Sequence, residues 1–156
     1  MKTRVLMVCL GNICRSPLAE GILKAKVDEN KVFVDSAGTG DYHIDSSPDP
    51  RSIAIAKKKK LDITDQRGRQ FGVEDFDNFD HIYVMDNSNF KDVIALARND
   101  EDRAKVELIL DKIFPAENVD VPDPYFGGDQ GFANVYDMLD QACDQIAQEL
   151  KEEHKA

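Results

Sequence analysis

The segment of residues 9–17 constrains the fold more than any other part of the chain. It reads CLGNICRSP and directly follows an apolar run at residues 5–8. An apolar run that ends in Gly, Asn and Ser is typical of a buried strand followed by a tight loop. Pro17 suits the first turn of a helix, Ser16 can cap that helix, and Glu20 suits the positive end of its dipole. The sequence therefore predicts a strand, a short loop and a helix that begins at Ser16 or Pro17.

A loop at the start of a helix points several backbone N–H groups at one spot, where they can bind a tetrahedral anion such as phosphate. Arg15 adds a planar guanidinium that can contact two phosphate oxygens at once. Cys9 stands at the start of the loop, so its sulfur would lie under the bound phosphorus. The N–H dipoles, Arg15 and the Ser16 hydroxyl would all favour the thiolate over the thiol. The predicted phosphate-binding loop comprises Leu10, Gly11, Asn12, Ile13, Cys14, Arg15 and Ser16.

The pattern C-x5-R-S, filled here as CLGNICRS, resembles the signature loop of the low-molecular-weight protein tyrosine phosphatases, and PLAE at residues 17–20 extends the resemblance. The resemblance implies an α/β fold in one domain over residues 1–156. It implies a four-stranded parallel sheet in the order 2-1-3-4, with helices on both faces. It also implies hydrolysis of phosphotyrosine and other aryl phosphate monoesters through a cysteinyl-phosphate intermediate.

The rest of the chain alternates strand and helix signals, as a parallel sheet requires. Runs of β-branched and apolar residues predict strands at residues 32–38, 81–85 and 106–110. Capping residues and apolar periodicity predict helices at residues 17–29, 50–60, 73–76, 87–98 and from 132 onward. Cys143 falls on the apolar stripe of the last helix, so we expect it to be a core residue.

Cleavage of a phosphate ester also requires a proton for the leaving oxygen, and Asp123 is the candidate general acid. It lies in the sequence VPDPYF, where two prolines restrict the direction of its carboxylate. The resembling family has its acid in the same D-P-Y context. Tyr42, Tyr125 and Phe126 are expected to form the rim of a deep slot that suits an aryl ring. Phosphoserine would be too short to reach Cys9 in such a slot.

The resemblance also implies how the loop is supported. Ser36 matches a serine that hydrogen-bonds the loop asparagine, which is Asn12 here. Asp86 follows a predicted strand, where it could contact Arg15 or cap the next helix. This chain has Gln66 near the place where the family often has a buried histidine that bonds the asparagine, so the sequence leaves the bracing of the loop open.

The three cysteines are too few for a disulfide framework and too widely spaced for a zinc pattern. They favour a reducing, cytoplasmic location. The resemblance implies that Cys14 can form a reversible disulfide with an oxidised Cys9. We expect no metal or other cofactor, because Arg15 and the loop N–H groups already neutralise the phosphate charge.

The net charge and the hydropathy of the chain indicate which classes of binding partner to expect. A net charge of −10 argues against nucleic acid as a partner. No apolar run approaches the length of a membrane span, so we expect no membrane association. The expected partners are tyrosine-phosphorylated proteins as substrates and inorganic phosphate as product and inhibitor.

Three other functions remain open. Arsenate reduction runs on the same fold and loop, but it needs a relay of further cysteines that the middle of this chain lacks. Arginine-phosphate phosphatases related to this family carry threonine at the position of Ile13. A phosphotyrosine-binding module without activity would not need Cys9, Arg15 and Asp123 together.

Overall fold

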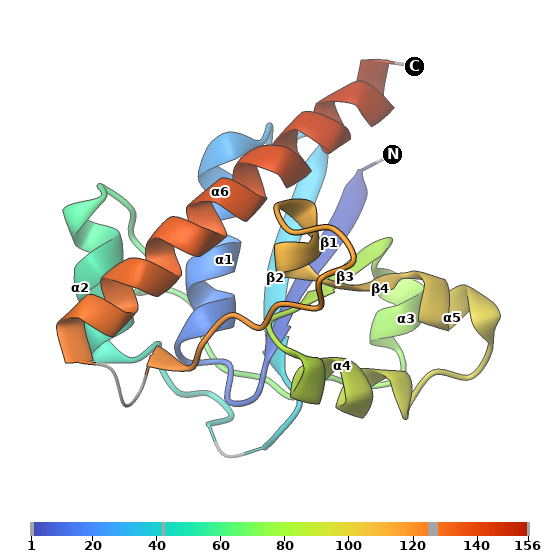
Figure 1. Cartoon of the computed structure of the whole chain (residues 1–156), viewed down its shortest axis with the longest axis horizontal. Helices are drawn as coiled ribbons and strands as arrows, with labels where there is room; N and C mark the ends of the chain where they lie inside the picture. The colour runs from blue at the N-terminus through green and yellow to red at the C-terminus, as the bar shows by residue number, and fades with distance from the viewer. Residues whose placement is uncertain (1, 42, 125–127, 156) are drawn as a thin grey trace.

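The computed structural model describes residues 2–41, 43–124 and 128–155. Four strands form one sheet in which every pair is parallel and the order is β2-β1-β3-β4 (Figure 1). This arrangement confirms the predicted α/β class, strand order and strand direction. The strands are β1 (Thr3–Cys9), β2 (Val32–Gly38), β3 (His81–Val84) and β4 (Val106–Leu108).

Helices cover both faces of the sheet, as predicted. On one face, α1 and α6 pack together over the strands, and α2 packs against both of these helices (Figure 1). On the other face lie α3 and α4, and α5 lies beside β4. No helix within the described ranges is both long and apolar enough to cross a membrane. The helices are α1 (Arg15–Lys26), α2 (Pro50–Lys58), α3 (Asp75–Asn78), α4 (Asn87–Ile94), α5 (Asp100–Ala104) and α6 (Gly128–Lys155).

The central strand β1 is buried on both faces, which explains its unbroken apolar run. Alternate side chains of the strand enter two separate cores, with Val5 and Met7 under α1 and α6, and Leu6 and Val8 on the opposite face. Each fully buried side chain of this size contributes about 1.5–3 kcal/mol of transfer free energy. Cys143 of α6 is fully buried in the first core, which confirms its predicted place.

Several element boundaries differ from the sequence prediction. The first helix ends at Lys26 instead of residue 29, because Asp28 begins a turn there: its carbonyl accepts hydrogen bonds from the N–H groups of Lys31 and Val32. Residues Ile109–Lys112, predicted in part as strand, form a 3-10 helix. The last helix begins at Gly128, four residues earlier than predicted.

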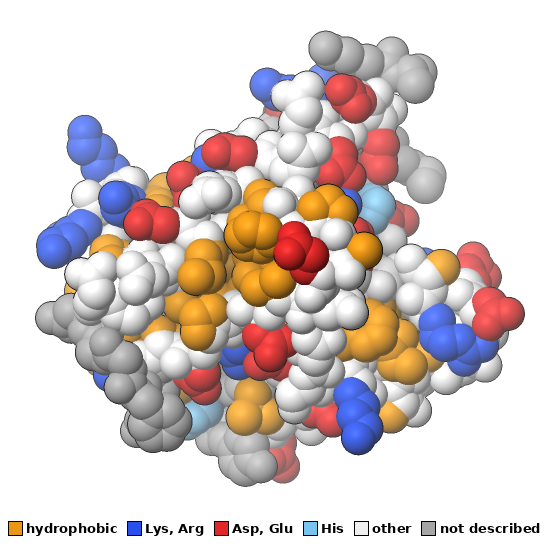
Figure 2. Space-filling model, in the orientation of Figure 1, with side chains coloured by type: hydrophobic (Ala, Val, Ile, Leu, Met, Phe, Trp, Pro, Cys, Tyr) orange, Lys and Arg blue, Asp and Glu red, His pale blue; other side chains and the backbone are white. Residues whose placement is uncertain are grey.

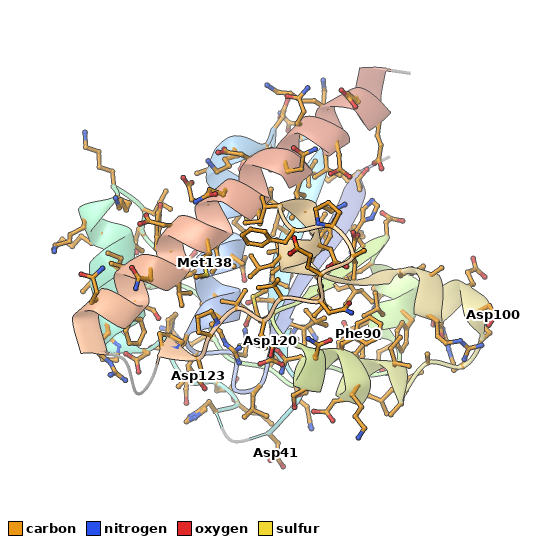
Figure 3. The ribbon with its side chains drawn as sticks, viewed as in Figure 1. Asp41, Phe90, Asp100, Asp120, Asp123 and Met138 are labelled. Atoms are coloured by element: carbon orange, nitrogen blue, oxygen red, sulfur yellow. The ribbon has the colours of Figure 1, made fainter. Side chains whose placement is uncertain are left out.

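The segment after the 3-10 helix lies along α6 and returns the chain to the carboxyl edge of the sheet (Figure 1). Hydrophobic side chains gather at the centre of this face in Figure 2, and Figure 3 labels one residue of α6 in this region, Met138. Ile113, Val119 and Met138 are partly buried against the core. At the edge, the N–H of Val121 donates to the carbonyl of Met85, 2.8 Å away. The fold thus joins residues 121–124 to the end of β3.

Gly38, the last residue of β2, lies directly under the predicted phosphate-binding loop. A Cβ there would lie 2.7 Å from the carbonyl oxygen of Leu10 and 3.1 Å from the backbone nitrogen of Asn12. We predict that Gly38→Ala lowers the free energy of unfolding in urea by about 1–3 kcal/mol, because backbone atoms must move. Gly131→Ala, where the nearest atom is 3.5 Å away, is the matched control. Equal stability of the two variants would contradict this prediction.

Candidate active site

The sulfur of Cys9 lies at the end of β1, under the first turn of the predicted phosphate-binding loop. Its side chain is buried, with 3% of the residue exposed. The backbone N–H of Asn12 donates to Cys9 Sγ at 3.3 Å, and Ser16 Oγ lies 3.0 Å from the same sulfur. Hydrogen bonds to a sulfur favour its charged form. The loop therefore places one backbone N–H donor and one hydroxyl against the Cys9 sulfur.

Asn12 is the centre of the loop. Its φ of 57° places it in the left-handed region, which asparagine tolerates better than most residues. Its Nδ2 donates to Ser16 Oγ at 2.8 Å and to Ser36 Oγ at 3.0 Å. Its Oδ1 accepts a hydrogen bond from the backbone N–H of Arg69 at 3.0 Å. The expected contact between Asn12 and Ser36 is thus present. The hydrogen bond with Ser16 lies within the loop, and those with Ser36 and Arg69 tie the loop to neighbouring segments.

The predicted capping role of Ser16 is wrong. The first helix begins one residue earlier, at Arg15, and its N-cap residue, Cys14, makes no side-chain capping bond. Ser16 Oγ instead turns toward Cys9 and Asn12. The helix starts early because Cys14 already lies in the right-handed helical region and its carbonyl oxygen accepts a hydrogen bond from the N–H of Leu18 at 3.4 Å.

Glu20 also differs from its predicted place in the first helical turn. It lies farther along α1 and is buried, with 4% exposed. Ser36 Oγ donates to its Oε1 at 2.6 Å, and Lys24 Nζ lies 2.6 Å from its Oε2. Burial is the largest influence on Glu20 and raises its pKa above the usual value, although the hydrogen bonds from Lys24 and Ser36 oppose this rise. Its interactions therefore bind it to the loop network and not to the helix dipole.

The guanidinium of Arg15 is held at the mouth of the loop by two segments. Its Nη1 donates to Asp86 Oδ2 at 2.7 Å and to the carbonyl oxygen of Val121 at 2.8 Å. Asp86 also accepts a hydrogen bond from the N–H of Asn89 as the N-cap of α4. Both of the roles considered for Asp86 therefore occur together. The two contacts fix the guanidinium beside Cys9 and connect it to the segment that carries Asp123.

Arg69 braces the loop in a way that the sequence did not reveal. Its guanidinium forms ion pairs with Asp75 at 3.0 Å and with Asp35 at 3.2 Å. Its backbone is anchored as well, because its carbonyl oxygen accepts a hydrogen bond from the N–H of Gly38 at 2.8 Å, while its own N–H donates to Asn12. Gln66 instead donates to a backbone carbonyl of α1. A backbone donor therefore supports the loop asparagine, and no residue type in the sequence signals such a donor.

Cys14 is a second buried thiol in the loop. Burial, together with the negative charges of Asp49, Cys9 and Asp123, raises its pKa to about 12. Because a thiol is neutral below its pKa, Cys14 is protonated at physiological pH and is a poor nucleophile there.

Asp123 is exposed and follows Val121 by two residues. Its charge acts on Arg15 and Cys14, which places it electrostatically within reach of the loop. Asp120, on the same segment (Figure 3), binds the backbone and side chain of Asn87 at 2.8 and 2.6 Å.

Other predicted features of the site are only partly described by the structure. The predicted rim residues Tyr42, Tyr125 and Phe126 lie outside the described residues. Within the described ranges, no three His, Cys, Asp or Glu side chains are grouped to hold a metal ion.

The comparisons with known proteins agree with this geometry. The family model described as low molecular weight phosphotyrosine protein phosphatase matches residues 4–156. A Synechocystis sp. protein, named as a low molecular weight protein-tyrosine-phosphatase, is 42% identical over 154 residues, which are 96% of this chain and 98% of that protein. The crystal structure of a protein tyrosine phosphatase from Entamoeba histolytica, with Hepes in the active site, is 35% identical with a TM-score of 0.90, covering 98% of this chain and 99% of that one. Vibrio vulnificus Wzb in complex with benzylphosphonate is 28% identical with a TM-score of 0.85, covering 96% and 99%. The chain belongs to the low molecular weight phosphotyrosine protein phosphatase family.

Proposed function

We propose that this protein hydrolyses phosphotyrosine and other aryl phosphate monoesters through a cysteinyl-phosphate intermediate, as one catalytic domain over residues 1–156. The observation that carries the proposal is the buried Cys9 sulfur, with the Asn12 N–H at 3.3 Å, the Ser16 hydroxyl at 3.0 Å and the Arg15 guanidinium fixed beside it. Membership in the family supports the same activity.

In the first step, the Cys9 thiolate attacks phosphorus, so that an S–P bond forms as the bond to the phenolic oxygen breaks. The protonated carboxyl of Asp123 donates its proton to the leaving oxygen. The loop N–H groups and Arg15 donate hydrogen bonds to the three other phosphate oxygens and stabilise the charge that develops there.

In the second step, water attacks the phosphorus of the intermediate. The Asp123 carboxylate takes a proton from the water, and the S–P bond breaks to return the Cys9 thiolate. Inorganic phosphate leaves the loop and, because it fits the same donors, also inhibits the enzyme.

An aryl substrate fits the proposed site best. The related Vibrio vulnificus Wzb structure is in complex with benzylphosphonate, whose phosphonate group is joined to a phenyl ring through one methylene group, which supports a slot for an aromatic ring. Tyr42, Tyr125 and Phe126 remain the predicted walls of that slot. The substrates are tyrosine-phosphorylated proteins, and the acidic net charge of −10 disfavours nucleic acid. We place the protein in the reducing cytoplasm on account of its three free cysteines.

The proposed reaction predicts that p-nitrophenyl phosphate and phosphotyrosine peptides are hydrolysed, and that Cys9→Ser lowers kcat by about a thousandfold or more, because serine is a far weaker nucleophile. Cys143→Ala, which removes a buried thiol outside the site, is the control and should keep its activity. An active Cys9→Ser variant would contradict the proposal. The proposal would also be contradicted if phosphoarginine were hydrolysed faster than phosphotyrosine, if the protein reduced arsenate with a thiol as reductant, or if it bound phosphotyrosine without hydrolysing it.

If Asp123 is the general acid, Asp123→Asn should slow the hydrolysis of phenyl phosphate by about 100-fold or more and affect p-nitrophenyl phosphate much less. The reason is that p-nitrophenolate is a good leaving group that hardly needs a proton. Asp120→Asn, on the same segment, should affect both substrates equally. Rates of the two esters measured side by side test this, and equal slowing by Asp123→Asn would remove Asp123 from the role.

We also propose that oxidation of Cys9 is reversible through Cys14. Hydrogen peroxide converts the Cys9 thiolate to a sulfenic acid, and Cys14 Sγ then attacks that sulfur, forming the S–S bond as water leaves. Burial and the negative charges of Asp49 and Asp123 keep the pKa of Cys14 raised after Cys9 is oxidised, so below that pKa the thiolate fraction of Cys14, and with it the rate of closure, should rise about tenfold per pH unit.

Intact-mass analysis after brief peroxide treatment checks the disulfide. The wild type should lose two hydrogens, and dithiothreitol should restore them. Cys14→Ser should instead gain two or three oxygens, whereas Cys143→Ala should behave like the wild type. Stable addition of oxygens to the wild type would show that no protective disulfide forms.

A further inference from the structure

A groove runs between α2 and the first turns of α6, and the proposed reaction does not use it. It encloses about 320 Å³, within the range of about 300–1,000 Å³ that is usual for ligand pockets. The α2 residues that line the groove are spaced three or four apart, so they lie on one face of that helix. Among the lining residues are Arg51, Ala54, Ile55 and Lys58 of α2, and Phe132 and Ala133 of α6.

The groove begins beside the phosphate-binding loop, because the start of α2 is joined to that loop. The N–H of Asp49, the N-cap of α2, donates to the carbonyl oxygen of Ile13 at 2.8 Å. The hydroxyl of Ser52 donates to the carbonyl oxygen of Cys14 at 3.4 Å. A peptide whose phosphotyrosine occupied the loop would therefore have the groove within reach of its neighbouring residues.

The part of the groove nearest the loop offers apolar contacts and no unopposed charge. The guanidinium of Arg51 lies over the ring of Phe132, 4.6 Å from its centroid. The same guanidinium is paired with Asp49 at 3.2 Å, so a negative charge already faces it. Ala54 and Ile55 add aliphatic surface. This end of the groove therefore suits an uncharged part of a peptide.

The far end of the groove is positively charged. Lys58 lines it and belongs to a run of four exposed lysines, residues 57–60. Figure 2 shows basic side chains at the left edge of the molecule, where Figure 1 draws α2. In the part of the chain that the structure describes, no acidic side chain pairs with any of the four, and Asp62, which follows them, accepts hydrogen bonds from Thr64. Such a concentration of positive charge, on a chain of net charge −10, attracts acidic groups.

The distance between the two ends of the groove fits a short peptide segment. Lys58 follows Ser52 by six residues, which is about 9 Å along a helix. An extended peptide covers that length with about three residues. We propose that the groove binds an acidic segment of the substrate protein, about three to five positions from phosphotyrosine, and that Lys58 selects it. The inference rests on the proposed function, which places phosphotyrosine in the loop.

The lysines also lie at the carboxyl end of α2, where cations stabilise a helix through its dipole. If they served only that purpose, their loss would lower the stability of the protein and would affect peptides of every charge alike. Docking of an acidic segment instead predicts that the rate depends on the charge of the peptide. The two roles are therefore separated by comparing substrates.

The test measures kcat/KM by phosphate release from phosphotyrosine peptides of equal length. They carry glutamate, alanine or lysine at the proposed positions, on the amino or the carboxyl side of phosphotyrosine. We expect the wild type to prefer glutamate over alanine by about fivefold on at least one side, the effect of an exposed ion pair, and to disfavour lysine there. The preference should shrink between about 0.1 M and about 1 M salt, because the screening length falls from about 10 Å to about 3 Å.

Charge reversal at the groove gives the sharper comparison. Lys58→Glu should remove the preference for glutamate peptides and favour lysine peptides instead. Lys57→Glu is the matched control, because it makes the same change of charge in the same helical turn at a residue that does not line the groove. It should keep most of the preference. The proposal is overturned if both variants lose the preference equally, if Lys58→Glu keeps it, or if the wild type does not distinguish the peptides.

Circular dichroism melts show which variants are folded. If Lys58→Glu does not fold, Lys58→Gln decides, because it removes the charge and keeps a long polar side chain: a reduced preference for glutamate supports the proposal, and an unchanged one overturns it.

The small ester p-nitrophenyl phosphate does not reach the groove, so it separates failure of this inference from failure of the proposed function. If the proposed function fails, the wild type hydrolyses neither this ester nor any of the peptides. If only the docking of an acidic segment fails, the wild type hydrolyses the ester and hydrolyses all the peptides irrespective of their charge.

Discussion

The site depends on the left-handed conformation of Asn12 and on the three side-chain hydrogen bonds that hold it. With φ at 57°, the backbone N–H of Asn12 points at the Cys9 sulfur. A strained residue keeps such a conformation only when its surroundings over-determine it. Here Ser16, Ser36 and the backbone of Arg69 supply those constraints from three different segments. Much of the tertiary structure around the loop serves to fix this one residue.

The parallel sheet explains why distant segments can act together. All of its strands end at one edge, so the loops after β1, β2 and β3 meet there (Figure 1). Arg15, which follows β1, contacts Asp86, which follows β3, and the carbonyl of Val121. This contact joins the anion-binding loop to the segment of the candidate acid. In the proposed mechanism, the residue that attacks phosphorus and the residue that protonates the leaving group therefore belong to one connected framework.

The acidic character of the chain does not oppose anion binding. Ions screen exposed carboxylates over about 8 Å at physiological salt, whereas the buried loop is screened much less. The Arg15 guanidinium belongs to this buried part, since the residue is 4% exposed, and the N–H of Asn12 points inward to Cys9. Buried carboxylates nearby are each bonded to specific donors: Glu20 to Lys24 and Ser36, and Asp75 to Arg69.

The sequence by itself determined the parallel α/β fold, the strand order by resemblance, and the loop with its cysteine and arginine. It could do so because hydrophobic periodicity and the C-x5-R-S spacing are local properties of the chain. The resemblance also predicted the support of Asn12 by Ser36, but only the tertiary structure decided the rest of the bracing of the loop. The N–H that Arg69 donates to Asn12 belongs to the backbone. Nearly every residue has such a donor, so the residue type at this position does not reveal the contact. Ser16 and Glu20 were assigned to a helix end on local grounds, yet both bind partners that only the folded chain brings near.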